Sequence, residues 1–259
     1  MDENILTILI STMNEGIKKV ENVVEYRHPL VEYLIIHQNP KGIEVPETLF
    51  REDINIIERD ETGLSKSRNT GLDSCRTKYA VIADDDVRYF KDSFETILNK
   101  MENGNYDVLL FKIKTNPEEP EYKNYPRSDY TLNNGFKHWF SSIEIVIRTE
   151  AINKYNLRFD EKFGLGTKLK KGEEEVFISD CMKAGLRCGY INEYIVSHPY
   201  ESTGKKKESM IEKEIFFGAL DRRTSNFRIS ARRCLSYCIR PYYAIRDFVY
   251  LIGYLSHRR

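Results

Sequence analysis

The stretch that decides the fold is Tyr79-Ala80-Val81-Ile82-Ala83-Asp84-Asp85-Asp86, a short apolar run that ends in three aspartates. An apolar run of this length with β-branched residues is typical of a buried strand. Three adjacent carboxylates repel one another unless a cation lies among them, and Mg²⁺ or Mn²⁺ binds carboxylate oxygens while keeping positions open for substrate phosphates. The alternative is an aspartate cluster that caps the next helix. The position after an apolar strand favours a metal site.

Strand and helix patterns alternate on both sides of this stretch. Strands are expected at residues 5–10, 31–36, 54–57, 79–83 and 108–111. Helices are expected around Ile17–Val24, at 64–75 and around Phe94–Met101, from apolar residues three and four apart. This alternation predicts an α/β fold with a mainly parallel sheet and helices on both faces. Ligands of such sheets bind beyond the carboxyl ends of the strands, so the polar residues there should share one edge.

The second half of the chain is less regular. Residues 116–137 are polar, contain three prolines and are expected to form a long loop. A strand is expected at 143–148, a helix from Val176 to Ala184 and a last strand at 187–194, which ends near His198.

Several motifs resemble those of the family 2 glycosyltransferases of GT-A fold. They occur in the family's order: Ile8 to Glu15, Gly63 to Leu72, Ala83 to Val87, Phe159 to Gly164, and Gly172 to Glu175. The resemblance covers about residues 4–200. It implies a domain of residues 1–200, with a nucleotide-sugar donor half at 1–115 and an acceptor half at 116–200. Residues 201–259 would be a basic, amphipathic, helical extension.

The resemblance also implies roles for individual residues. Asp86 would bind Mn²⁺ or Mg²⁺, and His198 is a second metal ligand, with a surface or core histidine as the alternative. Residues expected to bind the donor are Ser11, Met13, Glu15, Gln38, Arg68, Asp84 and Asp85. Glu15 could instead interact with a helix dipole, and Arg68 could form an internal ion pair rather than bind phosphate. Trp139, in the segment that resembles the acceptor loop, either stacks on a sugar or fills the core.

Glu174 is the candidate catalytic base. An inverting transfer needs one group to take the proton of the acceptor hydroxyl, and a carboxylate can do so. Glu173 and Glu175 are rivals by adjacency, and an acidic, solvated helix start is the structural alternative. Glu174 stands where the family usually has aspartate, so the carboxylate is kept on a side chain longer by one methylene.

Charge is unevenly distributed along the 259 residues. Basic and acidic residues number 40 each, but residues 201–259 carry a net charge of +7, which leaves −7 for residues 1–200. An acidic body argues against a nucleic-acid groove, while the basic tail suggests an anionic surface. Nine arginines between residues 221 and 259 alternate with apolar side chains, which favours an interfacial membrane helix. Packing on the catalytic domain, or on a second subunit in a homodimer, is the alternative.

The expected location is the cytoplasm, at the inner face of a bacterial membrane. No signal peptide is visible, the longest apolar run of the tail (248–255) is too short to span a bilayer, and the five cysteines form no CxxC pair. The predicted function is a metal-dependent, inverting transfer of a sugar, with UDP the favoured nucleotide, to a saccharide or lipid-linked saccharide. The family resemblance implies that this transfer belongs to capsule, O-antigen or exopolysaccharide synthesis. The alternatives are a nucleotidyltransferase and a membrane-associated scaffold that has lost catalysis.

Overall fold

The computed structural model describes residues 4–133, 140–200, 209–224 and 244–256, with side chains from residue 248 onward in the last segment. Trp139, Cys234 and Cys238 lie outside the described residues. Cys75, Cys181 and Cys188 are buried free thiols that pack within the hydrophobic core.

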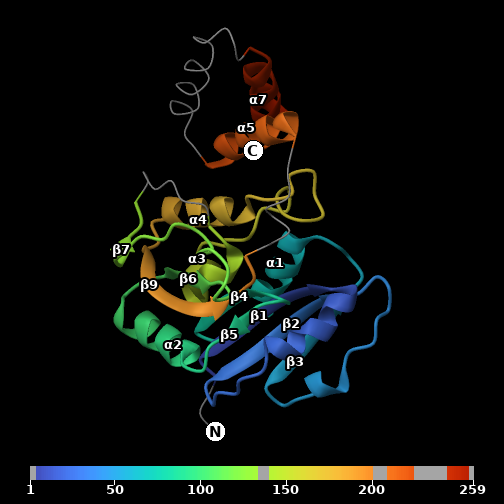
Figure 1. Ribbon diagram of the computed structural model, residues 1–259, viewed down its shortest axis with the longest axis vertical. Helices are drawn as coiled ribbons and strands as arrows, with labels where there is room; N and C mark the ends of the chain where they lie inside the picture. The colour runs from blue at the N-terminus through green and yellow to red at the C-terminus, as the bar shows by residue number, and fades with distance from the viewer. Residues whose placement is uncertain (1–3, 134–139, 201–208, 225–243, 257–259) are drawn as a thin grey trace.

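A nine-stranded sheet forms the centre of the molecule (Figure 1). Four neighbouring strands, in the order β3-β2-β1-β4, run parallel: β1 (Leu6–Met13), β2 (Val31–Gln38), β3 (Ile54–Arg59) and β4 (Tyr79–Asp84). Beyond β4 the order continues with β8 (Ile145–Arg148), β6 (Val108–Lys114), β9 (Cys188–Ser197) and β5 (Arg88–Tyr89), while β7 (Tyr130–Thr131) also pairs with β9. Strand β8 is antiparallel to β4 and β6, whereas β6 and β9 are parallel. The expected α/β fold with a mainly parallel sheet is confirmed.

Helices cover both faces of this sheet. One face packs against η1 (Asn14–Asn22), a 3₁₀ helix, and α2 (Ser93–Asn103). The other face packs against α1 (Leu64–Ser74), α3 (Thr149–Lys154) and α4 (Glu173–Lys183). Alternate residues of the central strands point to opposite faces, so that Ile8 joins the first core and Leu9 the second. Two short 3₁₀ turns, η2 (Glu47–Leu49) and η3 (Ser142–Glu144), complete the domain.

Several elements in the second half differ from the sequence-based expectation. The strand expected from residue 143 begins at Ile145, because Ser141 and Glu144 form a capping box that starts a 3₁₀ turn. Glu144 is buried, and its carboxylate binds Lys123 and Tyr125 at 2.7 Å each. The last strand continues to Ser197 rather than ending at 194. The long loop contains the short strand β7.

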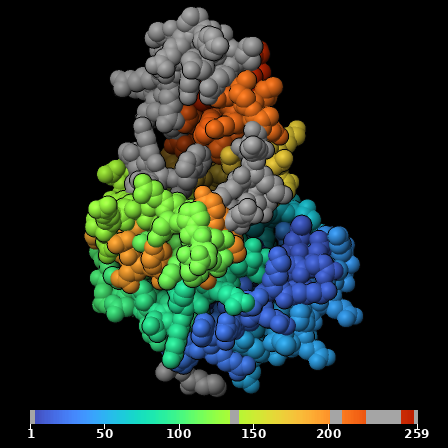
Figure 2. Space-filling view, viewed as in Figure 1, coloured from blue at the N-terminus to red at the C-terminus, as the bar shows by residue number. Residues whose placement is uncertain are grey.

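The C-terminal extension forms helices α5 (Met210–Thr224) and α7 (Ala244–Ser256), which pack on each other beyond α4 (Figure 1). The space-filling view shows the surface of α5, in orange, at the same end of the molecule (Figure 2). Their backbones approach closely at glycines: a Cβ at Gly218 would lie 2.1 Å from the carbonyl oxygen of Tyr250, and one at Gly253 would lie 2.1 Å from that of Ile215. Among the residues that the structure describes, no helix has the length and apolar character needed to cross a bilayer.

Candidate active site

The carboxyl ends of the four parallel strands bring the predicted donor residues to one edge of the sheet. Ser11 of β1 lies opposite Asp84 of β4 in the strand register, and Ser67 donates a hydrogen bond to Ser11 Oγ at 2.9 Å. Gln38 ends β2 and donates to the carbonyl oxygen of Gly63 at 3.1 Å. Met13 ends β1 with half of its surface exposed (50%). Because the strands are parallel, these side chains share the edge that the sequence predicted.

Glu15 begins the first turn of η1 and is largely exposed, with an ion pair to Lys18 at 2.6 Å. Gly16 follows it and lies against the aspartate cluster. A Cβ at Gly16 would come within 2.1 Å of Asp85 Oδ2 and 2.6 Å of Thr12 Oγ1. This position therefore requires glycine if the carboxylate of Asp85 is to keep its place.

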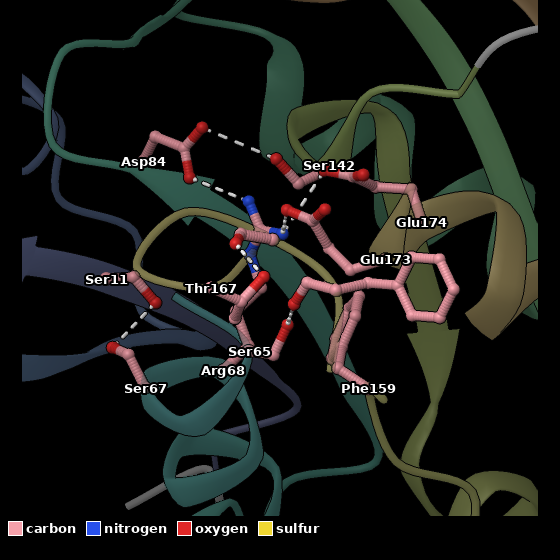
Figure 3. Close-up of polar contacts among 12 residues, drawn as sticks. Ser11, Ser65, Ser67, Arg68, Asp84, Ser142, Phe159, Thr167, Glu173 and Glu174 are labelled. Carbon is pink, nitrogen blue, oxygen red and sulfur yellow. Dashed lines mark hydrogen bonds and ion pairs between the residues drawn. The ribbon is translucent and has the colours of Figure 1, made fainter. Parts of the chain in front are cut away.

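The three aspartates after β4 point to different partners. Asp84 binds Arg68 at 3.2 Å and accepts a weaker hydrogen bond from Ser142 at 3.4 Å (Figure 3). Asp85 accepts a hydrogen bond from Thr12 Oγ1 at 2.7 Å. Asp86 lies 3.2 Å from His198 Nε2. Separate partners reduce the repulsion that three adjacent carboxylates would otherwise have.

The pairing of Asp86 with His198 joins the two predicted metal ligands. The hydrogen bond from His198 lowers the pKa of Asp86 below its ordinary value. Burial opposes protonation of His198, but the hydrogen bond and charge of Asp86 prevail and raise the pKa of His198. The described residues contain no cluster of three or more His, Cys, Asp or Glu side chains placed to hold a metal. One carboxylate and one imidazole fit Mn²⁺ better than Mg²⁺, which prefers oxygen ligands, and a donor diphosphate and water would supply the remaining ligands.

Arg68 is the central cation of the site. It lies in α1, only 2% of its side chain is exposed, and its guanidinium contacts three carboxylates. Nη1 donates to Glu173 Oε1 at 3.0 Å and to Glu174 Oε1 at 3.2 Å, while Nη2 donates to Asp84 Oδ1 at 3.2 Å (Figure 3). The guanidinium carbon also lies 5.4 Å from the ring centre of Phe159. These contacts agree with the internal ion pair that was one of the two interpretations of Arg68.

Burial and charge oppose each other in this cluster. Burial alone would lower the pKa of Arg68, but Asp84, Glu174 and Glu173 outweigh it and raise that pKa. Burial raises the pKa of Glu174, repulsion from Glu173 raises it further, and Arg68 only partly opposes them. One cation among three carboxylates therefore favours a proton on the cluster.

The three consecutive glutamates at the start of α4 have different surroundings. Glu173 is buried, and its Oε2 has no hydrogen-bond partner among the residues that the structure describes. Glu174 shares Nη1 of Arg68 and keeps 13% of its side chain exposed, against 4% for Glu173. Glu175 accepts the backbone N–H of Phe140 at 3.0 Å, and burial raises its pKa to about 7. Of the two that Arg68 holds, Glu174 is the more accessible.

Helix α1 also holds the segment that precedes α4. Ser65 Oγ donates to the carbonyl oxygen of Phe163 at 2.7 Å. The Asn69 side chain binds both backbone groups of Phe159, donating to the carbonyl at 3.0 Å and accepting from the N–H at 2.8 Å. Gly164 has φ +99, and a Cβ there would lie 2.9 Å from Ser65 Oγ. Residue-by-residue assignment missed Ser65 and Asn69, although both lie in the Gly63–Leu72 motif.

Comparison with known proteins identifies a family and a fold. The family model described as glycosyl transferase family 2 matches residues 7–187. S. aureus TarS 1–349 in complex with UDP is similar in fold, with a TM-score of 0.61 and 14% identity over 97% of this chain and 70% of that chain. The same fragment in complex with UDP-GlcNAc gives a TM-score of 0.62 and 14% identity over 98% of this chain and 72% of that chain. S. aureus TarS in a longer form gives 0.66 and 14% identity over 98% of this chain and 55% of that one. No curated protein matches significantly.

The sheet and its covering helices therefore have a GT-A-like fold. The chain belongs to glycosyl transferase family 2 and is a glycosyltransferase.

Proposed function

We propose that this enzyme transfers a sugar from a nucleoside diphosphate donor, UDP being favoured, to a hydroxyl of a saccharide or lipid-linked saccharide. The observation that carries the proposal is the buried Arg68, which joins Asp84 at the donor edge to Glu174 at the start of α4. The S. aureus TarS structures with UDP and UDP-GlcNAc support the choice of nucleotide. The family resemblance supports a role in bacterial surface polysaccharide synthesis.

In the proposed reaction Glu174 acts as the base. Its carboxylate takes the proton of the acceptor hydroxyl while the hydroxyl oxygen forms a bond to the anomeric carbon. The bond from that carbon to the diphosphate breaks, and attack from the opposite side inverts the configuration. Glu174 is held for this step by Arg68 at 3.2 Å.

Asp86 and His198 would hold Mn²⁺ or Mg²⁺, and the ion would neutralise the negative charge of the departing nucleoside diphosphate. Ser11, Met13, Glu15 and Gln38 would line the nucleoside site, with Asp84 and Asp85 at its border. For Arg68, three carboxylate contacts favour a role in positioning these groups over direct phosphate binding.

The test is a thermal-shift panel of UDP, GDP, ADP and CDP, each with Mn²⁺ and with EDTA. A ligand that binds only the folded state raises the melting temperature according to its affinity. We expect a shift with UDP that requires Mn²⁺ and is lost in Asp86→Ala, together with release of UDP from UDP-GlcNAc or another UDP-sugar. No shift with any nucleotide would favour the inactive scaffold, and release of pyrophosphate from a nucleoside triphosphate would favour a nucleotidyltransferase.

For the C-terminal extension we propose contact with an anionic membrane surface, as expected at the cytoplasmic face. Three apolar side chains of α7 are exposed at helical spacing: Phe248 (65%), Ile252 (44%) and Leu255 (68%). Arg222 and Arg223 contact other residues of the chain. The other seven arginines of residues 221–259, whose side chains lie outside the described residues, would attract anionic headgroups. We expect sedimentation with vesicles of phosphatidylglycerol and phosphatidylcholine, but not with phosphatidylcholine alone, and loss of binding in Phe248→Glu. A homodimer in solution whose interface is broken by Phe248→Glu would contradict this proposal.

A further inference from the structure

Helix α5 lies outside residues 7–187, the part of the chain that the family model matches, yet it contacts the segment that leads to the glutamates. Arg223, near the end of α5, makes three charged hydrogen bonds. Its Nε donates to Asp160 Oδ2 at 2.8 Å, while Nη1 and Nη2 donate to the two oxygens of Asp180 at 2.8 and 2.5 Å. Asp160 begins the segment before α4, and Asp180 lies within α4.

A second contact lies beside the candidate base. Gly172 directly precedes Glu173, has φ +92, and packs so closely on α5 that a Cβ there would lie 2.7 Å from a ring carbon of Phe216. The same ring belongs to an apolar cluster with Phe163 and Val176, from the segment and from α4. The backbone at Gly172 therefore cannot move toward α5 without displacing Phe216.

These contacts enclose residues 160–173 between two helices. Helix α1 binds the segment through Ser65, at the carbonyl oxygen of Phe163, and α5 binds it through Arg223 and Phe216. Arg223 neutralises two carboxylates that would otherwise repel each other across the gap between the segment and α4. A bidentate guanidinium–carboxylate pair also fixes orientation as well as distance.

We propose that Arg223 is a positioning residue for the transfer reaction, and that α5 holds the glutamate-bearing helix α4 in place. Arg223 joins Asp160 to Asp180, near the end of α4, while Phe216 of the same helix α5 packs on Gly172 at its start. Together these contacts fix the helix on which Glu174 must meet the acceptor hydroxyl. This inference rests on the proposed function of Glu174. A displacement of about 1 Å at a reacting group can reduce the rate about 100-fold. Loss of the Arg223 contacts should therefore lower kcat more than it weakens donor binding.

The test compares Arg223→Gln and Arg223→Lys with Arg222→Gln, in the full chain. Arg222 is a matched control, because it is the adjacent residue of α5 but hydrogen-bonds Tyr254 of α7 at 3.1 Å instead of the glutamate-bearing segment. The readouts are kcat and KM for the UDP-sugar that the wild type turns over, the Mn²⁺-dependent thermal shift with UDP, and hydrogen exchange of residues 159–175.

We expect Arg223→Gln to lower kcat at least tenfold, with KM for the donor and the UDP shift within twofold of wild type. Exchange should increase in 159–175 and stay unchanged in β1 and β4. Arg223→Lys keeps the positive charge but not the planar guanidinium, so its kcat should lie between those of the wild type and Arg223→Gln. Arg222→Gln should retain wild-type kcat. Asp160→Asn should add little to Arg223→Gln, because both remove the same ion pair.

The inference is overturned if Arg223→Gln lowers only the melting temperature, or if Arg222→Gln lowers kcat equally. Additive losses from Asp160→Asn and Arg223→Gln would likewise overturn it. A wild-type protein that binds UDP yet turns over no UDP-sugar would instead contradict the proposed function. In that case, increased hydrogen exchange of residues 159–175 in Arg223→Gln but not in Arg222→Gln would still show that Arg223 holds this segment. Unchanged hydrogen exchange would exclude that role.

Discussion

Arg68 Nη2 lies 3.2 Å from Asp84 Oδ1, and Nη1 of the same guanidinium lies 3.2 Å from Glu174 Oε1. One buried side chain thus links the end of β4, where the donor is expected, to the start of α4, where the base is expected (Figure 3). Arg68 itself lies in α1, a third element, which packs on β1 and β2. The donor edge and the candidate base are therefore parts of one electrostatic unit.

Removal of this cation should destabilise the protein strongly. Arg68→Met leaves three carboxylates without their counter-charge, and breaking such a buried network costs about 3–5 kcal/mol. The free energy of unfolding in urea measures the loss. Lys66→Met on the same helix is the control: it removes an exposed ion pair with Glu61, so its effect should stay within about 1 kcal/mol. Equal unfolding midpoints for the two variants would show that the Arg68 network does not stabilise the fold.

Glu174→Gln should separate chemistry from binding. The amide keeps the size of the side chain but cannot accept the proton, so kcat should fall about 10²- to 10⁴-fold while the UDP–Mn²⁺ thermal shift persists. Glu175→Gln should cost less, because its carboxylate accepts the N–H of Phe140 and an amide oxygen can do the same. Steady-state kinetics on both variants decide between them, and a larger loss in Glu175→Gln would transfer the role of base to Glu175.

The activity should depend on pH through the glutamate cluster. Burial raises the pKa of Glu174 and brings that of Glu175 to about 7. A base works only when deprotonated, so kcat should rise with pH along a limb centred above the ordinary glutamate value of about 4.3. Interacting carboxylates titrate as a set, and the limb belongs to the cluster rather than to one residue. A pH–rate profile that is flat from pH 5 to 8 would contradict the assignment.

The raised pKa of Glu175 also makes the stability of the folded protein depend on pH. A carboxyl whose pKa is higher in the folded state binds its proton more tightly there, so protonation favours folding. For Glu175 this contribution is fully present below the unfolded pKa, near 4.3, and is lost as the pH rises to about 7. Glu175→Gln should therefore flatten the dependence of the melting temperature on pH across this interval.

His198→Gln should weaken Mn²⁺-dependent UDP binding without destabilising the folded protein. It removes the imidazole that lies 3.2 Å from Asp86, so the Mn²⁺ concentration for half-maximal UDP binding should rise about tenfold or more. His28→Gln, at a histidine whose neighbouring carboxylate is Glu95 at 3.9 Å, is the control and should leave that concentration unchanged. Titration of the UDP thermal shift with Mn²⁺ measures both. An unchanged midpoint in His198→Gln would remove His198 from the metal site.

Gly16→Ala should disturb the aspartate cluster through steric contact alone. The added methyl group would lie 2.1 Å from Asp85 Oδ2 and must displace it. Gly71→Ala is the control, since its added methyl group meets its neighbours at 3.6 Å, an ordinary contact. Isothermal titration with UDP and Mn²⁺ should show weaker binding in Gly16→Ala only. Equal affinities would mean that Asp85 does not shape the donor edge.

The sequence by itself determined the local elements and the edge on which the site lies. Apolar runs and helical spacings are properties of neighbouring residues, so they predicted β1 to β4, α1 and α2, and placed Asp84–Asp86 at a carboxyl end. Local periodicity failed at Glu144, because alternation cannot distinguish a strand from a 3₁₀ turn that buries one carboxylate beside Lys123.

The tertiary structure alone decided which charged groups meet. Arg68 and Glu173 are 105 positions apart, and Arg223 and Asp160 are 63 apart, so no local pattern records either pair. The sequence left two interpretations of Arg68, and its contacts with carboxylates of β4 and α4 in the folded chain favoured the ion pair. Composition assigned α5 to a basic tail, whereas in the folded chain this helix packs against the start of α4. Such contacts depend on how distant elements pack, and only the folded chain contains that information.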